Sequence, residues 1–401
     1  MLTLFDGHSA VVTPEALEQA GIRGPMTFGS RSTIVCDDAG VPTGRVLEAG
    51  ALALVDAVLP AAPLAERAAG LGRLLDEMAA TGLTGGHVMD LSGDAIDLYR
   101  WLDERGRLPM RLRLAPWCAP EDDRDRWAEI VAMQSLAGSL WSVDGVKLFM
   151  DGTIDGGTAW LHAPDCHGES TAAYWLDPGD YSAAVRFFAA AGVPTATHAI
   201  GDAAVHHVLD TIESDDHRDR GTRHRVEHIE TLRDDQVGRF VRLGVVASMQ
   251  PTHATDYTLA DLSDNWSNRL GEERARRGWR SRDIAATGAV LALGSDWPIA
   301  PYDPRWVMRS ARDRRSVPHP EAAPVRPEQA LTAEQALAGF TTAPAYAASH
   351  ESVAGRVRVG YRADLSVFTQ DPVRTGPADL PDLPVVLTVV DGRVRHRSPE
   401  V

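Results

Sequence analysis

Short apolar runs alternate with longer amphipathic segments over most of this chain. The apolar runs predict strands, and the amphipathic segments, whose apolar positions recur every three or four residues, predict helices. Strands are expected near residues 83–89, 110–116, 144–150, 193–199, 224–229, 245–250 and 289–295. Helices are expected over 64–80, 179–192, 203–213 and 331–348, with an N-terminal cap near Thr332 in the last. This alternation is typical of βα units around a parallel sheet.

The number of these units indicates the fold class. They predict an α/β protein with a (β/α)8 TIM-like barrel, of which strand one is not accounted for in this chain. A doubly wound sheet also alternates strand and helix, but no GxGxxG motif follows an early strand. Beyond residue 350 the helical pattern stops, and 363–370 and 385–397 read as strands. We expect a barrel over 1–350, incomplete at its N-terminus, and the C-terminal part of a small β-sandwich over 351–401.

The amino-acid composition argues against some classes of binding partner. The net charge of −16 over 401 residues does not supply the basic surface that nucleic-acid phosphates need. No apolar stretch is long enough to cross a bilayer, and no signal peptide is visible. Cys36, Cys118 and Cys166 lie far apart, which favours a reducing cytoplasm over a disulfide framework. We expect a cytoplasmic protein with a small-molecule substrate and neither nucleic acid nor membrane as a partner. A homo-oligomer is left open.

Four polar residues share one position, at or near the C-terminal end of a predicted strand. They are Lys147, His198, His228 and Asp296. The carboxyl ends of parallel barrel strands meet on one face, and imidazoles with a carboxylate are ligands that a zinc-class metal prefers. Each residue also has a simpler interpretation: a loop hydrogen bond for a histidine, a turn cap for Asp296, a buried salt bridge for Lys147. Lys147 is, however, the only lysine among 40 basic residues, and together the four favour a metal site.

The segments around these residues resemble the amidohydrolase superfamily. Their sequences are similar to those of the third amidohydrolase family, which includes N-substituted formamide deformylase-like proteins. The matching segments run in order along nearly the whole chain: GVKLFMDGTIDGGTAWL, THAIGDAAV, RVEHIE, VASMQPTH, ALGSDWP, TAEQALAGFTTAPA and GRVRVGYRADLSVF. The resemblance implies a carboxylated Lys147 that bridges two metals, with His198 and His228 as further ligands. It also implies that Asp296 binds metal and moves a proton from water to the leaving nitrogen.

Four further residues are candidates for contact with the substrate. His253 follows the strand near 245–250 and is expected to polarise a substrate oxygen, although a turn-stabilising role fits it equally. Asp151 is expected at the metal rim, Trp297 in an apolar pocket after the last strand, and His8 in a substrate loop. For His8 the match is weaker, because Val11, Val12 and Thr13 replace the Trp-Val-Asn that the family has after its histidine.

One part of the family pattern is missing. The resemblance requires a His-x-His motif on strand one, and no His-x-His occurs in these 401 residues. A misassigned start codon, a truncated gene and a genuinely reduced form with one metal or none are the three explanations, and we favour the first. We expect a metal-dependent amidohydrolase, with one or two zinc-class ions, that hydrolyses a non-peptide C–N bond of an N-formyl or N-acyl amide. The alternative is a catalytically reduced barrel with a binding role, and another electrophile on the same site is a third hypothesis.

Overall fold

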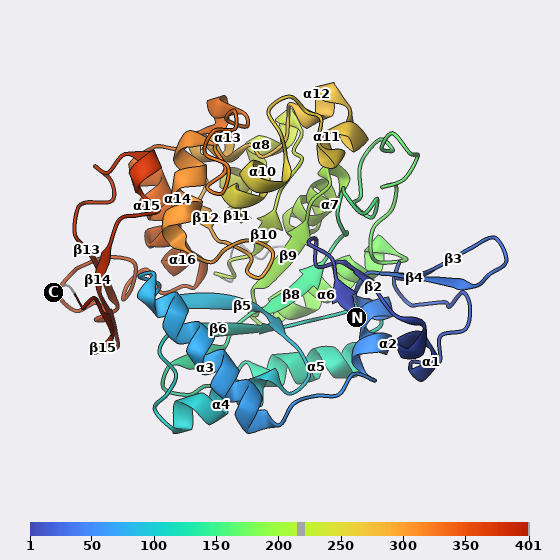
Figure 1. Ribbon diagram of the computed structural model, residues 1–401, viewed down its shortest axis with the longest axis horizontal. Helices are drawn as coiled ribbons and strands as arrows, with labels where there is room; N and C mark the ends of the chain where they lie inside the picture. Colours follow the sequence, from blue (N-terminus) through green and yellow to red (C-terminus); the bar gives the residue numbers. More distant parts are fainter. Residues whose placement is uncertain (215–220, 400–401) are drawn as a thin grey trace.

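The computed structural model describes residues 1–214 and 221–399. Its centre is a series of parallel strands: β5 (Gly85–Leu91), β6 (Arg111–Pro116), β7 (Trp141–Val143), β8 (Val146–Phe149), β9 (Thr195–Ala199), β10 (Arg225–His228), β11 (Val246–Met249) and β12 (Leu291–Leu293). One sheet has the order β12-β11-β10-β9-β8 and a second the order β5-β6-β7 (Figure 1). Each predicted strand overlaps one of these. The short strand β7 is an addition that the sequence pattern does not indicate.

An isolated parallel bridge between Trp117 and Lys147 connects the two sheets, so that β8 follows β6 in space. The strands β5, β6, β8, β9, β10, β11 and β12 therefore succeed one another as strands two to eight of a βα barrel would. Among the described residues no ladder joins β12 to β5. The prediction of a mixed α/β fold with parallel sheets is confirmed, and closure into a barrel stays a prediction.

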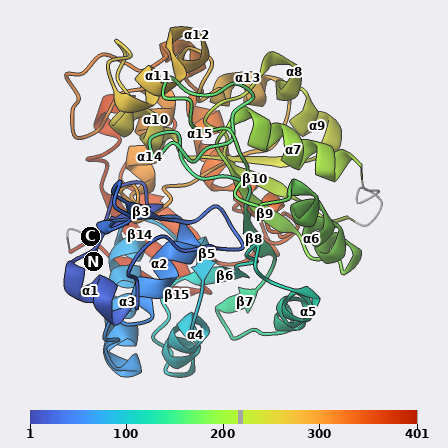
Figure 2. The same ribbon diagram turned by 90° about the vertical axis from the view of Figure 1, so that its right-hand side faces the viewer.

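The central strands are covered on both faces. Every residue of β9, β10 and β11 is buried, which is the pattern of parallel strands enclosed by helices. Figure 2 shows α5 (Arg124–Met133), α6 (Pro178–Ala190) and α7 (Asp202–Glu213) on the outer side of the sheet. The main apolar cluster joins these helices to the strands and includes Val146, Leu148, Val185, Phe188, Val205, Val208 and Val226. This packing fixes where the strands end.

The remaining helices of this part follow the βα order. They are α3 (Leu64–Ala80), α4 (Ala95–Glu104), α8 (Asp234–Val237), α9 (Arg239–Leu243), α10 (Pro251–Tyr257), α11 (Asn265–Leu270), α12 (Glu272–Ala275), α13 (Ser281–Ala286) and α14 (Pro304–Asp313). The helix predicted over 64–80 is confirmed at both ends, and those predicted over 179–192 and 203–213 correspond to α6 and α7.

The helix predicted over 331–348 is two helices, α15 (Ala333–Phe340) and α16 (Thr342–Ala347). Its start is confirmed: Thr332 Oγ1 accepts from the Gln335 backbone N–H at 3.2 Å, and the Gln335 side chain accepts from Thr332 N–H at 2.9 Å. The break falls at Thr341, whose φ of −125° and ψ of −79° are not helical. Pro344 explains it, because proline has no N–H to donate to the carbonyl four residues earlier.

Residues 1–56 form a unit that the sequence pattern does not indicate. The strands β1 (Leu2–Thr3), β2 (Ser9–Val11), β3 (Thr33–Cys36) and β4 (Pro42–Leu47) make an antiparallel sheet in the order β1-β2-β4-β3, with helices α1 (Pro14–Gln19) and α2 (Ala49–Asp56). These strands are too short to show a clear alternation. The unit has its own apolar cluster, and its segment between β1 and β2 reaches the end of β9, where the His8 and His198 rings are 4.8 Å apart.

The C-terminal strands β13 (Leu365–Phe368), β14 (Val385–Val390) and β15 (Arg393–Arg397) form an antiparallel sheet, as predicted for strands in this region. The sheet packs on α3, where Thr388 Oγ1 donates to the Ala79 carbonyl at 2.7 Å. Arg111, at the start of β6, donates to Asp364 at 2.9 Å and to Asp391 at 3.1 Å. The expected division at residue 350 into a barrel and a β-sandwich module stays a prediction.

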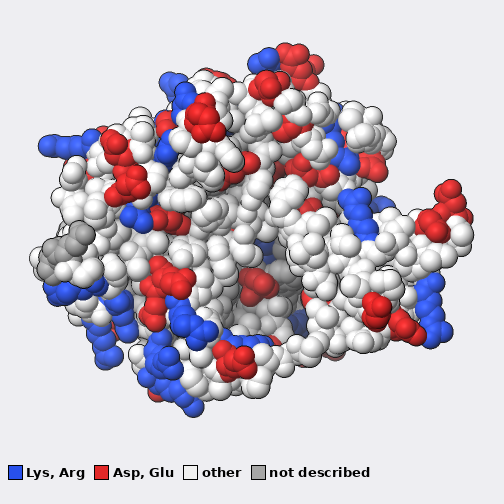
Figure 3. Space-filling view, in the orientation of Figure 1, with Lys and Arg blue, Asp and Glu red and all other residues white. Residues whose placement is uncertain are grey.

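No helix among the described residues is long and apolar enough to cross a membrane. Charged side chains of both signs are spread in small groups around the face shown in Figure 3, which is hollowed near its centre. This face has no broad basic patch of the kind that binds nucleic-acid phosphates.

We expect Arg111→Met to lower the free energy of unfolding by about 1–2 kcal/mol, because the partly buried Asp364 carboxylate and the exposed Asp391 carboxylate lose a charged donor. The matched control is Arg126→Met on α5, which removes a surface pair with Glu129 whose side chains are 42% and 67% exposed; we expect less than about 1 kcal/mol there. Urea unfolding of the two variants is the measurement. Equal losses in both would contradict a structural role for the Arg111 contacts.

Candidate metal centre

The parallel register brings the predicted strand-end residues together. Lys147 lies on β8, and His198 on β9 pairs with Phe149 of β8 on one side and Glu227 of β10 on the other. His228 is the last residue of β10, and its ring centroid is 4.5 Å from that of His198. Asp296 follows β12. The structure therefore brings His198, His228 and Asp296 into the lining of one pocket, and the role of the four residues as metal ligands stays a prediction.

Two of these residues have an unusual backbone conformation. His228 has a φ of 76° and Asp296 a φ of 58°, and both values lie in the left-handed region, which is costly for residues other than glycine. In each case the strand turns sharply where it ends. Such strain is found where surrounding structure holds a side chain in a set direction, and here both side chains line the same pocket.

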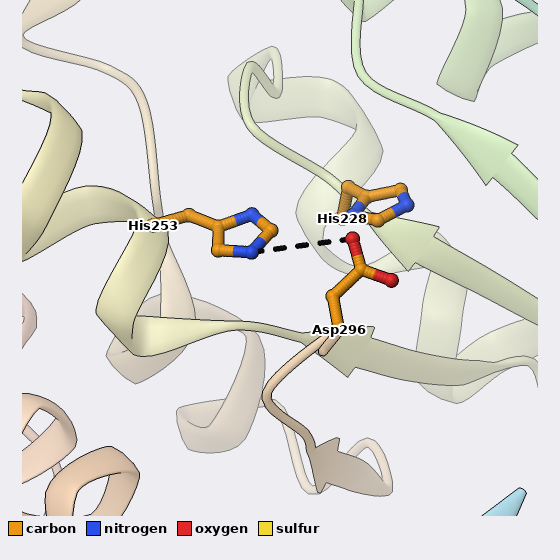
Figure 4. Close-up of side chains that lie close together, drawn as sticks. All are labelled: His228, His253 and Asp296. Atoms are coloured by element: carbon orange, nitrogen blue, oxygen red, sulfur yellow. Dashed lines mark ion pairs between the residues drawn. The ribbon is translucent and has the colours of Figure 1, made fainter. Parts of the chain in front are cut away.

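His228, His253 and Asp296 form the tightest group (Figure 4). One ligand atom of each lies within 4.8 Å of the others, and His253 Nε2 is 4.0 Å from Asp296 Oδ2. Among the described residues no other group of three histidine, cysteine or acidic side chains comes this close. His228 Nδ1 and His253 Nε2 are buried without a hydrogen-bond partner. Buried imidazole nitrogens without partners fit a zinc-class metal, which accepts nitrogen and carboxylate ligands in a compact shell.

His198 has the hydrogen bond expected of a metal ligand. Its Nε2 is 3.0 Å from the Gly152 carbonyl, so this nitrogen carries the proton and donates, which leaves the lone pair on Nδ1. Metal-ligating histidines commonly donate their other ring N–H to a carbonyl or carboxylate in this way. Burial holds the pKa of His198 and of His228 well below the usual range, and positive neighbours lower it further. Both shifts favour the neutral imidazole, which is the form that binds a metal.

Lys147 is buried at the same face, with 4% of its surface exposed. Its Nζ is 4.8 Å from the centroid of the Phe149 ring, and among the described residues it forms no ion pair within 4.0 Å. Burial lowers the pKa of the Lys147 amine, although the carboxylates of Glu227 and Asp296 act in the opposite direction. The salt-bridge interpretation of Lys147 is thus not what the structure shows.

Asp151 lies beneath the pocket rather than in its wall. It is fully buried and accepts three backbone N–H groups, from Trp160 at 2.8 Å, Ile200 at 2.9 Å and Gly201 at 2.8 Å. These bonds join the loop after β8 to the loop after β9. Burial raises the pKa of Asp151 to about 7. Substrate binding by Asp151 stays a prediction, and the geometry gives the residue an organising role.

His8 lies at the site together with Glu48, a residue that sequence reasoning missed. His8 Nδ1 is 2.8 Å from Glu48 Oε2; burial lowers the pKa of His8, but the carboxylates of Glu48, Asp6 and Asp296 together outweigh it and raise the pKa above the usual value. Glu48 is buried, has a φ of 67°, and its Oε1 has no partner. A Cβ at Gly152 would lie 2.1 Å from that oxygen, so the loop after β8 leaves room for Glu48. The only sign of Glu48 in the sequence is an acidic residue within an apolar run.

An open pocket lies over the cluster. Its lining includes His8, His198, His228, His253 and Asp296 but not Lys147, so four of these five side chains reach the space from strand ends or the residues just after them, and His8 reaches it from the segment between β1 and β2. The aromatic part of its wall comprises Phe5, Tyr257, Trp266 and Trp279. Trp297 does not belong to the lining; it is 44% exposed and packs near Tyr302, 6.3 Å between ring centroids. Substrate contact by Trp297 stays a prediction.

The profile of the Amidohydrolase family matches residues 1–396. The chain belongs to this family. The resemblance found from its motifs is therefore confirmed, and family membership supports a hydrolase.

The chain is similar to curated relatives over nearly its whole length. It is 29% identical over 399 residues to "Putative amidohydrolase YtcJ" of Bacillus subtilis, covering 98% of this chain and 73% of that protein. It is 27% identical over 400 residues to "N-substituted formamide deformylase" of Arthrobacter pascens, covering 97% and 72%. Among solved structures, an uncharacterized metal-dependent hydrolase from Pyrococcus horikoshii matches with a TM-score of 0.72 at 23% identity, over 92% of this chain and 71% of that one. The similarity to this solved structure supports the mixed α/β fold of the chain.

We expect Gly201→Ala to destabilise the protein by about 1–3 kcal/mol, because an added methyl group overpacks a buried position. A Cβ there would lie 2.0 Å from the Trp160 carbonyl oxygen, a backbone atom that cannot rotate away. Gly238→Ala is the matched control: its φ of −74° is close to the −75° of Gly201, but nothing lies within 4 Å of its Cβ. We expect a change within about 0.5 kcal/mol there. Thermal unfolding of both variants tests this, and an unaffected Gly201→Ala would contradict the close packing.

Proposed function

We propose that this protein is a metal-dependent amidohydrolase that cleaves a non-peptide C–N bond, in an N-formyl or N-acyl amide of a small amine. The observation that carries the proposal is the group of His228, His253 and Asp296, in which the two buried imidazoles each have a nitrogen that lacks a partner. Family membership supports the reaction class. The name of the Arthrobacter relative supports a formamide as the kind of bond.

In this proposal His198, His228, Asp296 and a carboxylated Lys147 hold one or two divalent ions. The chemistry that such an ion supplies when bound is Lewis acidity, which lowers the pKa of water and polarises an amide carbonyl. Lys147 suits this role because its amine loses its proton more readily when buried. The neutral amine adds to carbon dioxide, forms an N–C bond and releases a proton, giving a carbamate with two ligand oxygens. The guanidinium of arginine stays charged and cannot form such a carbamate.

The chain's own groups handle the protons of the hydrolysis. Asp296 lines the pocket with a side chain that is 37% exposed, so its carboxylate accepts a proton from the attacking water. The water oxygen bonds to the amide carbon, the C–N bond breaks, and Asp296 delivers the proton to the leaving nitrogen. His253 Nε2, 4.0 Å from Asp296 Oδ2, is placed to donate to the substrate oxygen in its Nε2–H tautomer.

The first test is metal content and its dependence on Lys147. Purified wild-type protein, dialysed against zinc and then against buffer, is expected to retain one or two ions per chain, and Lys147→Arg to lose most of them. Arg126→Lys, the reverse exchange on the exposed face of α5, is the control and is expected to retain the wild-type amount. Elemental mass spectrometry gives the count. A Lys147→Arg protein that keeps both metal and activity would rule out the bridging carbamate.

The second test is hydrolysis itself. Zinc-loaded protein is expected to release amine from N-formyl or N-acetyl derivatives of small amines, and Asp296→Asn to reduce kcat by about 10²–10⁴-fold through loss of proton transfer. Asp180→Asn, an exposed position on α6, is the control and should be unaffected. Colorimetric detection of the released amine is the measurement. Metal-loaded protein that hydrolyses none of these amides favours the alternative of a barrel with a binding role only.

A further inference from the structure

Three carboxyl groups that are not part of the metal cluster line the same pocket. They are Asp6, Asp155 and Glu230, which we call the acidic wall. The pocket lining contains no lysine or arginine. Among the described residues none of the three forms an ion pair with a basic side chain. The nearest basic group that acts on Asp155, Arg269, is engaged elsewhere, at 2.6 Å from Asp165 and 2.9 Å from Glu169.

The acidic wall is held by neutral donors. Ser9 Oγ donates to Asp6 at 2.9 Å, Asn265 Nδ2 to Asp155 at 2.8 Å, and Trp266 Nε1 to Glu230 Oε2 at 2.6 Å. No donor among residues 1–214 and 221–399 hydrogen-bonds to Glu230 Oε1, although only 8% of Glu230 is exposed. Neutral donors orient a carboxyl group without compensating its charge, and burial accordingly raises the pKa of Glu230 to about 8. His8, the one histidine of the lining whose pKa is raised, is paired with Glu48 at 2.8 Å, so none of the three groups has a basic partner of its own.

The aromatic side chains of the pocket lie next to these carboxyl groups. Trp266, which donates to Glu230, stacks on Trp279 with ring centroids 5.9 Å apart. Both indoles are almost fully buried, however, and Arg326 lies 5.3 Å from the Trp266 ring centroid, so they support the wall and offer no open face. Phe5, one residue before Asp6, packs on Tyr257 with centroids 5.1 Å apart. Aromatic faces beside carboxylates attract organic cations, because the ring face is negative and the cation keeps a counter-charge. The combination is the one that proteins use for ammonium and guanidinium groups.

A metal ion does not fit the acidic wall. Among the described residues the only three histidine, cysteine or acidic groups with ligand atoms within 4.8 Å of one another are His228, His253 and Asp296. The carboxyl groups of the wall are thus too far apart to share one ion. They are spread around the wall of one open pocket, an arrangement that suits an organic ligand better than a single ion.

We propose that the pocket selects amides whose other end carries a positively charged nitrogen, an amine, amidine or guanidine, seated between the acidic wall and the rings of Phe5 and Tyr257. The inference rests on the proposed function and deepens it, since it names the substrate class. The scissile amide lies at the metal cluster and the cation lies at the acidic wall, because both sets of residues line one pocket. A neutral ligand of the same shape leaves the carboxyl groups uncompensated.

Two substrates of equal size test this. The formamide of 4-aminomethylbenzylamine ends in an ammonium group, and the formamide of 4-ethylbenzylamine ends in a methyl group at the same place. We expect zinc-loaded wild-type protein to prefer the cationic substrate by about tenfold or more in kcat/KM. In Glu230→Gln and Asp155→Asn the ratio should fall toward one, whereas Asp261→Asn, an exposed position on the loop before α11, should keep it. If kcat/KM of the wild-type protein is no higher for the cationic substrate than for the neutral one, the proposal is overturned.

Binding without turnover separates this proposal from the function on which it rests. Phenylguanidine and phenylurea have the same shape, but only the first is a cation. Calorimetry with the wild-type protein should show phenylguanidine binding at least about tenfold more tightly, with the difference reduced in Glu230→Gln. If no amide is hydrolysed but this preference holds, the proposed function fails and the cation pocket stands. Equal affinities, or a preference that survives in both acidic-wall variants, would overturn the cation pocket.

Discussion

The exclusion of water from the ends of β8, β9 and β10 is the constraint on which the site depends. Lys147, His198 and His228 lie there with almost no exposed surface, and burial disfavours the charged form of each. The parallel ladder sets their spacing, and the helices on the outer side keep solvent away. Burial therefore lowers the pKa of all three groups, which lie side by side, and shifts each toward its neutral form. That is the state in which nitrogen atoms bind a metal or react with carbon dioxide.

Holding these side chains together requires backbone strain, and other contacts offset part of its free-energy cost. His228, Asp296 and Glu48 adopt left-handed backbone conformations, each costing of order 1–3 kcal/mol. The three backbone bonds to Asp151 join the loops after β8 and β9 and offset part of this cost. Among the described residues no protein group hydrogen-bonds to His228 Nδ1 or His253 Nε2. A bound ion would compensate the His228 nitrogen, and a substrate oxygen would accept from that of His253.

The sequence predicts the parallel strands and the strand-end residues well, because buried strands are apolar runs and a polar residue that ends such a run is conspicuous. It does not predict Glu48, since the short antiparallel strands around it show no clear period and its contact with His8 depends on a left-handed turn. Nor does it show that Asp151 faces backbone N–H groups from residues 160, 200 and 201, which meet only in space. The acidic wall is hidden for the same reason: Asp6, Asp155 and Glu230 lie in separate loops.

Anomalous diffraction at the zinc absorption edge, from crystals of the zinc-loaded protein, tests the central claim most directly. The account predicts a peak among the strand ends, about 2.0–2.2 Å from a nitrogen of His228 and from an oxygen of Asp296. A second peak on the Lys147 side would show a bridged pair. Crystals that hold zinc only at surface positions, with the strand-end residues bonded to one another instead, would contradict the account.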